Sequence, residues 1–374
     1  MWFVPHLRFP EFSGEWKKCI IGDLATKVGS GVTPRGGESV YKTDGHPFVR
    51  SQNVGFGYLI LDDIAFIDEE THQRQKNTEL QLDDVLLNIT GASIGRSALV
   101  NTQVVGGNVN QHVCIIRTKN NLVPSFLCNF LLSNHGQKQI DSFQAGGNRQ
   151  GLNFEQIKSI KIAIPSIDEQ NKVAKLLQLI EERIATQTKI IDKLQSLIRG
   201  IAQNVVRNNK PNIRLSECLE CSSSTLQESD VCENGTYPVY GANGIVGYID
   251  NYNTEKEAVY IIKDGSGVGT VSYVTGKCSA TGTLNTLQSK EGYSLQYLYY
   301  MLKVFNFEPY KTGMAIPHIY FKDYGKAKIF CPSYTEQLKY VGLLSAIDNK
   351  LSAEQSILTD LSLQKQYLLR QMFI

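Results

Sequence analysis

The chain has 374 residues, of which 42% are hydrophobic and 20% are charged, and its formal net charge at pH 7 is +2. This length allows two or three domains, and this composition excludes a disordered chain. The small net charge gives no support to a broad basic coat for nucleic acid, but it leaves room for a basic face on each domain.

The first sixteen residues mix Pro, Arg, Glu and Lys, and they contain no apolar segment typical of a secretion signal. No run approaches the roughly 18 apolar residues that cross a membrane, so we expect a cytoplasmic protein with no membrane contact. Cys218 and Cys221 form a C-x-x-C pair, yet a zinc site needs a second well-spaced pair. We therefore expect packed, reduced cysteines and no metal.

Residues 1–165 are predicted to form the first globular domain, of mixed α and β structure. Runs rich in β-branched residues indicate strands at Asp84–Thr90 and His112–Arg117, separated by glycine-rich loops. The spacing of apolar residues predicts a helix over Pro124–Phe143.

A long helix is predicted over residues 166–206. Pro165 lies just outside it, Ser166 is the expected N-cap, and Glu169 stands where it would close a capping box. Apolar residues then alternate at spacings of four and three from Val173 to Val205, which is typical of a coiled coil. At 1.5 Å per residue, residues 168–206 would span roughly 58 Å.

Residues 207–332 are predicted to form a second globular domain, with strands at Ala258–Lys263 and Thr270–Val274 and a helix at Leu295–Val304. A second long helix is expected over residues 333–374. Two such helices packed antiparallel would form a stiff rod with a domain at each end.

The helix starts are repeated. Pro165-Ser-Ile-Asp-Glu-Gln170 returns as Pro332-Ser-Tyr-Thr-Glu-Gln337, an offset of 332 − 165 = 167. The same offset carries the apolar seam of the first helix onto the second, and the polar seam residue Gln187 onto Glu354. Matched caps, seams and polar breaks predict two helices that pack on each other. The first-helix seam positions are Val173, Leu177, Ile180, Ile184, Gln187, Ile191, Leu194, Ile198, Ile201 and Val205, and the second-helix positions are Tyr340, Leu344, Ile347, Leu351, Glu354, Leu358, Leu361, Lys365, Leu368 and Met372.

The globular parts also resemble each other, at offsets that fall along the chain. Ile21-Gly-Asp corresponds to Leu215-Ser-Glu at 194, Pro47 to Pro238 at 191, and Gly91-x-x-Ile-Gly95 to Gly265-x-x-Val-Gly269 at 174. The falling offsets indicate one α/β fold used twice, with shorter loops in the second copy. We therefore predict an internal pseudo-twofold repeat that presents two different surfaces.

Gly91-Ala-Ser93-Ile-Gly95 fits the G-x-S-x-G elbow of hydrolases, and His112, His135 or His318 could complete a triad. The repeat, however, has Gly267 in place of Ser93 and keeps both outer glycines. A tight turn explains that pattern better than a nucleophile does. The sequence also lacks a complete dinucleotide fingerprint and a phosphate loop.

Three segments, taken with the two helix starts, resemble the specificity subunits of type I restriction–modification systems along essentially the whole chain. They are Leu7-Arg-Phe-Pro-Glu-Phe-Ser-Gly-Glu-Trp16, Pro47-Phe-Val-Arg-Ser-Gln-Asn53 and Tyr237-Pro-Val-Tyr-Gly-Ala-Asn-Gly-Ile-Val-Gly247. The resemblance implies two target-recognition domains, at 1–165 and 207–332, separated by long antiparallel helices at 166–206 and 333–374.

The resemblance also implies a non-catalytic subunit that reads a bipartite, asymmetric double-stranded DNA target, with one half-site per domain and a gap set by the helices. Two methyltransferase subunits would dock near the helices, and translocase/nuclease subunits would join through the complex. S-adenosylmethionine, ATP and magnesium would be bound by those partners, and no cofactor by this chain.

Polar loop residues that can reach base edges or phosphates are the candidate DNA contacts. In the first domain they are Arg50, Ser51, Gln52, Asn53, Ser93, Arg96, Asn108, Asn110, Gln111, His112, Asn148, Arg149 and Gln150. In the second domain they are Tyr240, Asn243, Lys263, Ser266, Thr281, Thr283, Asn285, Lys311, Thr312 and His318.

Arg149 could offer a bidentate fork to guanine, whereas Ile316, at the equivalent repeat position, could touch only a thymine methyl. The principal alternative is a non-enzymatic coiled-coil scaffold whose globular modules bind protein or carbohydrate, which the small net charge favours. An RNA-binding module is a second alternative, but paired stacking aromatics on a recognisable sheet motif are not seen. Steep salt dependence of binding would distinguish a DNA reader from a scaffold.

Overall fold

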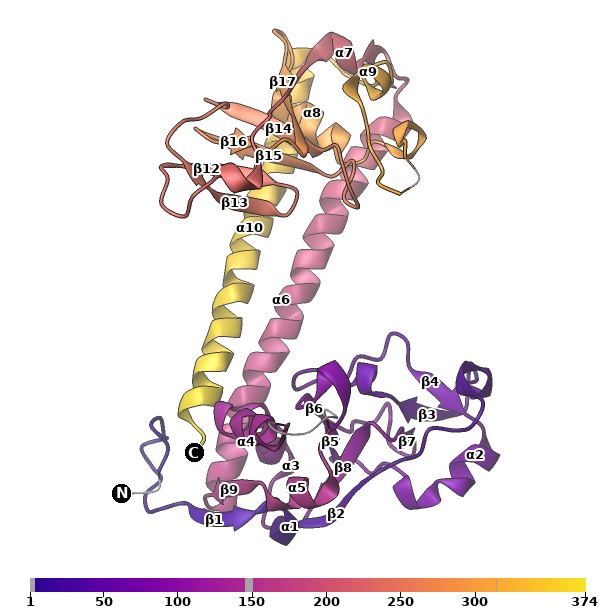
Figure 1. Cartoon of the computed structure of the whole chain (residues 1–374), viewed down its shortest axis with the longest axis vertical. Coiled ribbons are helices and arrows are strands. Elements are labelled where there is room, and N and C mark those ends of the chain that lie inside the picture. Colours follow the sequence, from indigo (N-terminus) through magenta and orange to yellow (C-terminus); the bar gives the residue numbers. More distant parts are fainter. Residues whose placement is uncertain (1–3, 145–150, 314) are drawn as a thin grey trace. The chain divides into compact units, whose positions relative to one another are not determined.

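A computed structural model describes residues 4–144, 151–313 and 315–374 (Figure 1). The chain divides into two compact units: unit 1 comprises residues 1–187 and 357–374, and unit 2 comprises residues 188–356. Two long helices, α6 (Ile167–Asn208) and α10 (Tyr334–Gln371), each contribute one end to each unit. Both long helices start and end within a few residues of the predicted limits.

The described residues of unit 1 form three small sheets. The four-stranded sheet is antiparallel, in the order β2-β8-β5-β6, and the three-stranded sheet has the order β4-β3-β7, with β3 and β7 parallel. The third sheet pairs β1 with β9 antiparallel. The strands are β1 (Lys17–Ile20), β2 (Ala25–Ser30), β3 (His46–Val49), β4 (Ala65–Ile67), β5 (Val85–Asn88), β6 (Ser97–Leu99), β7 (Asn108–Val109), β8 (Val113–Thr118) and β9 (Lys161–Ile164).

Unit 2 repeats these three sheets strand for strand. Its four-stranded sheet has the order β11-β17-β14-β15, its three-stranded sheet the order β13-β12-β16 with β12 and β16 parallel, and its two-stranded sheet pairs β10 with β18. This identical topology confirms the predicted duplication. The strands are β10 (Ile213–Arg214), β11 (Leu219–Ser223), β12 (Tyr237–Gly241), β13 (Gly244–Ile249), β14 (Glu257–Ile262), β15 (Val271–Thr275), β16 (Ser279–Ala280), β17 (Leu284–Ser289) and β18 (Lys328–Ile329).

Short helices connect the strands in both units. Unit 1 has α1 (Ile21–Leu24), α2 (Glu69–Arg74), α3 (Pro124–Leu132), α4 (Asn134–Gln144) and α5 (Phe154–Ser159), and unit 2 has α7 (Leu215–Cys218), α8 (Leu295–Leu302) and α9 (Phe321–Tyr324). The helix predicted over Pro124–Phe143 is therefore two helices. Ser133 between them has extended backbone angles, φ −72° and ψ 162°. A Cβ on Gly136 would lie 2.2 Å from the Phe130 carbonyl oxygen, so this glycine lets α4 fold closely against the end of α3.

The β5 strand is buried on both faces. Val85 and Leu87 belong to one hydrophobic cluster, while Leu86 between them belongs to another, as the two-residue period of a strand requires. The first cluster also includes Phe126 of α3 and the apolar residues at the unit 1 ends of both long helices, among them Leu177 and Leu368. The two helices and the sheet of unit 1 therefore share one core.

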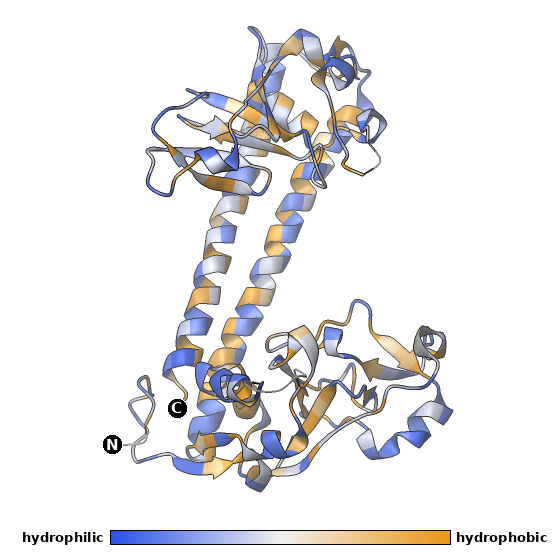
Figure 2. Cartoon of the chain, in the orientation of Figure 1, coloured by the Kyte–Doolittle hydropathy of each residue, from blue (hydrophilic) through white to orange (hydrophobic). Residues whose placement is uncertain are grey.

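The predicted seam of the long helices is confirmed. All twenty seam positions are buried or half-buried, including Gln187 at 7% exposed and Glu354 at 6%. Figure 2 shows hydrophobic residues recurring along α6 and α10 between hydrophilic ones. Lys365, a charged seam residue, forms an ion pair with Glu181 within unit 1 and donates to the Phe56 carbonyl oxygen at 3.1 Å. This lysine thereby ties a loop of the globular part to the helices.

The capping box predicted at the start of α6 is only half formed: the Ser166 hydrogen bond is present, but the prediction for the Glu169 side chain is wrong. Ser166 Oγ accepts from the Glu169 N–H at 3.4 Å, but the Glu169 carboxylate turns away from the helix backbone. It accepts two hydrogen bonds from the Arg8 guanidinium, at 2.7 and 2.8 Å, and one from Trp16 Nε1 at 3.2 Å. A guanidinium fork matches a carboxylate better than a single backbone amide does. The segment from Leu7 to Trp16 is thus fastened to the helix start.

In the second copy, Ser333 Oγ donates to Glu336 Oε2 at 2.8 Å, so this pair also departs from the predicted box. The feature that both copies keep is the next residue. Gln170 Oε1 accepts from the Val123 N–H at 2.8 Å, and Gln337 Oε1 accepts from the Ser294 N–H at 2.8 Å. Each amide also donates to the proline carbonyl before its helix, at 3.1 Å for Pro165 and 2.9 Å for Pro332. Both glutamines therefore join a long helix to the N-cap residue of α3 or α8.

The buried Glu169 carboxylate, 2% exposed, makes Arg8 a stability determinant. We expect Arg8→Ala to lower the free energy of unfolding by about 3 kcal/mol, because it leaves a buried charge without its bidentate partner. Urea denaturation measures the change. Arg74→Ala is the matched control, since the side chains of its pair with Glu70 are 73% and 76% exposed; a change below about 0.5 kcal/mol is expected. Equal effects of the two substitutions would contradict this role for Arg8.

Candidate nucleic-acid interface

In unit 1, three loops meet at one edge because β3 and β7 are parallel. Arg50 follows β3 and Asn110 follows β7, and the Asn110 N–H donates to the Val49 carbonyl at 3.1 Å. The Asn88 amide at the end of β5 donates to the Ser51 carbonyl at 2.8 Å. The Ile89 N–H donates to the His112 carbonyl at 3.0 Å. The structure therefore brings together residues 50–53, 88–96 and 110–112.

Several predicted residues at this edge are accessible. Gln52 and Gln111 are exposed, while Ser51, Ser93, Arg96 and His112 are half-buried. The His112 Nδ1 lies 2.6 Å from Thr90 Oγ1, and the Arg96 guanidinium lies 5.2 Å from the centroid of the Phe56 ring. These contacts position the His112 imidazole and the Arg96 guanidinium at this edge.

The Arg50 guanidinium is already bound by partners within the protein. Its Nη2 donates to the carbonyl and carboxylate oxygens of Asp63, at 2.5 and 3.2 Å, and its guanidinium lies 5.4 Å from the Tyr41 ring centroid. Gln52 also donates to the Asp63 carboxylate. Sequence reasoning missed Asp63, because nothing local indicates that a residue more than ten positions away orients both side chains.

Three of the predicted contacts in unit 1 are corrected, because their side chains are interior. Asn53 is 0% exposed and donates to the Ile60 carbonyl at 2.9 Å. Asn108 is 0% exposed, with Oδ1 2.7 Å from His72 Nδ1 and Nδ2 donating to the Gln75 carbonyl at 3.0 Å. Asn110 is 7% exposed and accepts from the His112 N–H at 3.0 Å. These buried asparagines shape the loops from inside through hydrogen bonds within the protein.

The equivalent edge of unit 2 is built in the same way. The Thr281 N–H donates to the Tyr240 carbonyl at 2.9 Å, and the Lys263 N–H donates to the Thr283 carbonyl at 3.1 Å. Asn243, Ser266 and Thr312 are exposed there, and Tyr240, Lys263, Thr283, Lys311 and His318 are half-buried. The loops after β12, β14 and β16 thus converge as their counterparts do.

Two predicted residues in unit 2 are corrected for the same reason as the asparagines. Thr281 is 1% exposed, with its hydroxyl 2.8 Å from that of Thr283. Asn285 is 4% exposed and accepts from Ser223 Oγ at 2.7 Å. Lys311 stays at the surface but is paired, its Nζ lying 2.5 Å from Glu308 Oε1.

A matching pair of β-bridges fixes the correspondence between the two edges. Thr90 bridges to Gly151 in unit 1, and Asp264 bridges to His318 in unit 2. The His318 Nδ1 lies 2.6 Å from Asp264 Oδ1, whereas in unit 1 the histidine beside Thr90 is His112, which lies in the turn before β8. Asn148, Arg149 and Gln150, which precede Gly151, lie outside the described residues.

The glycine turns confirm the preference for a turn over a hydrolase elbow. Gly91 and Gly95 have φ of 71° and 84°, and their repeat partners Gly265 and Gly269 have φ of 94° and 91°. Residues with a side chain rarely adopt a positive φ, so these four backbone positions favour glycine. Ser93 lies between two such residues in a single 3-10 turn, Gly91–Ser93.

The cysteine pair has no metal-site geometry around it. Within residues 4–144, 151–313 and 315–374, no cluster of His, Cys, Asp and Glu could hold a metal ion. Cys218 is buried and donates to the Leu215 carbonyl at 3.4 Å, and burial raises its thiol pKa to about 12. In that same part of the chain, no helix is long and apolar enough to cross a membrane.

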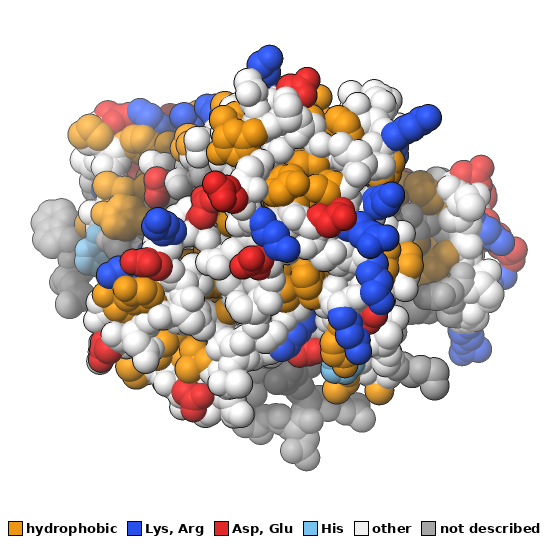
Figure 3. Space-filling model, turned by 90° about the horizontal axis from the view of Figure 1, so that it is seen from above, with side chains coloured by type: hydrophobic (Ala, Val, Ile, Leu, Met, Phe, Trp, Pro, Cys, Tyr) orange, Lys and Arg blue, Asp and Glu red, His pale blue; other side chains and the backbone are white. Residues whose placement is uncertain are grey.

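The surface charge is mixed. Figure 3 shows Lys and Arg side chains interspersed with Asp and Glu over the face seen from above, with several cations close together near one side. This local gathering is compatible with a small net charge, as the composition allowed.

Asn108 and Gln111 provide a test of which loop residues support the fold. We expect Asn108→Ala to lower the free energy of unfolding by about 1–3 kcal/mol, because it leaves buried partners at His72 and Gln75 unsatisfied. Gln111→Ala, at an exposed position in the turn that follows β7, should change the free energy of unfolding by less than about 0.5 kcal/mol. Chemical denaturation measures both, and a stability loss confined to Gln111→Ala would refute the assignment.

Comparisons with known proteins agree with this architecture. Among curated proteins, the chain is 20% identical over 199 residues to the putative type I restriction enzyme MjaX specificity subunit of Methanocaldococcus jannaschii, covering 52% of this chain and 46% of that relative. It is 24% identical over 261 residues to the putative type I specificity subunit S.MgeORF438P of Mycoplasma genitalium, covering 63% and 68%. The chain thus spans about half the length of the first relative and two thirds of the second.

Two solved structures share the fold. The crystal structure of the type I restriction-modification S subunit from M. genitalium matches with a TM-score of 0.67 at 18% identity, covering 99% of both chains. A structure concerned with complex assembly and conformational transition of the type I R-M system matches with a TM-score of 0.55 at 17% identity, covering 98% of both. The family described as type I restriction modification DNA specificity domain matches residues 13–196 and again residues 211–362. With one match over each globular part, the chain belongs to that family.

Proposed function

We propose that this chain is the DNA-reading, non-catalytic specificity subunit of a type I restriction–modification enzyme, and that each globular part reads one half of a bipartite, asymmetric duplex target. Family membership over most of the chain supports this proposal. The named relatives are specificity subunits of type I systems.

The observation that supports the proposal most directly is that the two units share one strand arrangement but have different side chains in the loops that it positions. Both units place the loops after a pair of parallel strands at one edge. At corresponding accessible positions after the second parallel strand, unit 1 has Gln111 and His112 where unit 2 has Gly282 and Thr283. Two copies of one scaffold that present different donors and acceptors are suited to reading different base sequences.

The accessible residues of each edge are the proposed contacts. In unit 1 the proposed contacts are Ser51, Gln52, Ser93, Arg96, Gln111 and His112, and the sequence adds Asn148, Arg149 and Gln150. Tyr240, Asn243, Lys263, Ser266, Thr283, Thr312 and His318 serve in unit 2. Amide and histidine side chains can read base edges, while lysine, serine and threonine suit phosphates. Arg50 and Lys311 would first have to exchange Asp63 and Glu308 for DNA.

The same proposal assigns the chemistry to partners. Two methyltransferase subunits dock near α6 and α10, and translocase/nuclease subunits join through the complex. Those partners bind S-adenosylmethionine, ATP and magnesium. The competing proposal, a scaffold that binds protein or carbohydrate, predicts an affinity nearly independent of salt. A DNA reader loses affinity steeply between low and moderate salt, because phosphate contacts release counterions.

A domain exchange tests the proposal. Replacing residues 1–165 with the first domain of another family member should change one half of the target and leave the other intact, because each unit has its own sheets and core. Mapping the bases methylated by the reconstituted complex measures this. An altered second half-site would refute it.

A heptad deletion tests the proposed role of the helices as a spacer. Removing residues 184–190 from α6 and 351–357 from α10 shortens each by roughly 10 Å, at 1.5 Å per residue. The tolerated gap between half-sites should shrink by about three base pairs, at 3.4 Å per pair. Deleting only residues 184–190 is the control, because it mismatches the two seams and should impair folding. An unchanged gap in the double deletion would disprove the role.

A further inference from the structure

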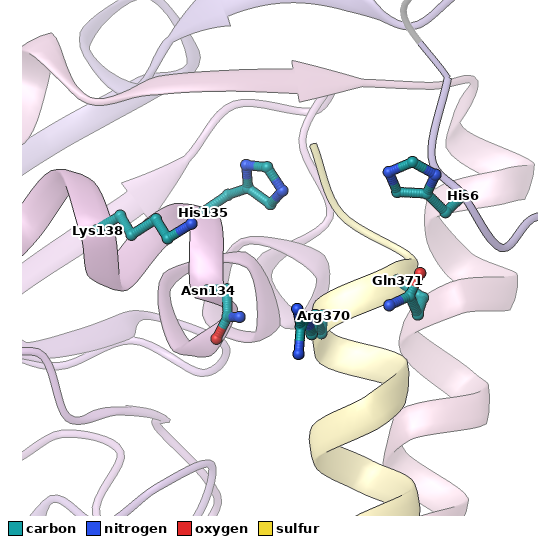
Figure 4. Close-up of a pocket in the computed structure, with 6 residues that line it drawn as sticks. All are labelled: His6, Asn134, His135, Lys138, Arg370 and Gln371. Carbon is teal, nitrogen blue, oxygen red and sulfur yellow. The ribbon is translucent and has the colours of Figure 1, made fainter.

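A cavity of about 240 Å³ opens in unit 1 where three segments of the chain meet. It lies between the N-terminal segment, the first turn of α4 and the last turn of α10. Its lining residues are His6, Asn134, His135, Lys138, Arg370 and Gln371. Figure 4 shows the rings of His6 and His135 directed toward the space beside the end of α10, where Arg370 and Gln371 lie. This volume holds a group much larger than one water molecule.

The lining is cationic and has no counter-ion of its own. Four of the six residues carry or can acquire a positive charge, and no Asp or Glu is among the lining residues. Within the described part of the chain, the side chains of His6, His135, Lys138 and Arg370 take part in no ion pair or hydrogen bond. Other surface cations of unit 1 do have a carboxylate partner, as Lys76 has in Glu79 and Lys158 has in Glu155.

The charges are close enough to affect one another. Burial lowers the pKa of His135, and repulsion from Lys138 and His6 lowers it further. His135 also lines a neighbouring larger cavity, which contains Lys18, Lys161 and the carboxylate of Asp23. An anion placed among these groups would remove the repulsion and favour the protonated ring.

Two structural features add to the attraction for an anion. The cavity lies at the N-terminal end of α4, an eleven-residue helix whose dipole places partial positive charge there. The Leu7 N–H donates to the Gln371 carbonyl at 3.0 Å, which holds the His6 segment against the end of α10. The amide side chains of Asn134 and Gln371 supply further donors to an oxyanion.

We propose that this cavity is a binding site for a phosphate group, held by His6, His135, Lys138 and Arg370. The group bridges the N-terminal segment, α4 and α10. It is separate from the edge loops of the candidate nucleic-acid interface, but it is connected to them through α4. Gln137, one turn beyond Asn134, donates to the Gly95 carbonyl of the glycine turn at 3.0 Å and to the Leu131 carbonyl at 2.6 Å. A ligand that fastens α4 therefore also steadies that turn.

Histidine NMR on the full chain tests the site, with pyrophosphate as the probe and sodium chloride at matched ionic strength as the reference. We expect the His6 and His135 signals to move together and to saturate with pyrophosphate alone, and the pKa of His135 to rise when the probe is bound. His135→Gln assigns the signal. Movement with chloride alone, or movement that never saturates, would overturn the proposal.

Matched variants locate the binding. Lys138→Gln combined with Arg370→Gln should weaken pyrophosphate binding at least tenfold, and both positions are exposed, so the chain should still fold. Arg183→Gln, an exposed arginine of α6 in the same unit, should leave the affinity unchanged. If the unchanged chain, the double variant and Arg183→Gln all bind pyrophosphate with equal affinity, the anion binds elsewhere and the proposed site is wrong.

Repeating the NMR titration with a short DNA duplex identifies the source of the phosphate. If the site takes a DNA backbone phosphate, a short duplex reproduces the His135 shift and displaces pyrophosphate. If it takes a free nucleotide or polyphosphate, the duplex leaves His135 unmoved while a nucleoside triphosphate competes. Both results support the site, and failure of all phosphate probes contradicts it whether or not the edge loops bind DNA.

Discussion

The hydrogen bonds of one buried glutamine in each unit are the constraint on which the architecture depends. Gln170 and Gln337 each use the amide oxygen to hold the N-cap of a globular helix and the amide nitrogen to hold the proline before a long helix. Both are essentially inaccessible, at 0% and 1% exposed. A buried amide with both ends satisfied fixes one geometry, because any other leaves polar atoms unpaired. Each globular part is therefore attached to its helices in the same way.

In both units, the polar loop residues fall into two groups: interior ones that support the fold and exposed ones at the surface. Interior asparagines and threonines, such as Asn108 and Thr281, hold the loops in shape through hydrogen bonds inside the protein. Their exposed neighbours, such as Gln111 and Asn243, remain free to differ between units without disturbing the fold. This separation allows a duplicated scaffold to acquire two specificities, since surface substitutions away from packed features change stability little.

The sequence predicted the architecture well because its signals were local and repeated. The heptad seam, the glycine turns and the four strands singled out from their composition were all confirmed. Predictions about individual side chains failed where the partner was distant in sequence. Glu169 pairs with Arg8 across 161 positions, and Asn108 meets His72 across 36. A polar residue in a loop looks the same in sequence whether it is solvated or buried, and only the folded chain distinguishes the two.

Selection of bound sequences from a random duplex library, with the chain assembled with its partner subunits, is the most direct measurement of the central claim. Two frames with different loop chemistry predict two short specified blocks of unlike sequence, separated by a gap of fixed length and free composition. One uninterrupted block, two identical blocks, or no enrichment over a library offered at high salt would contradict the account.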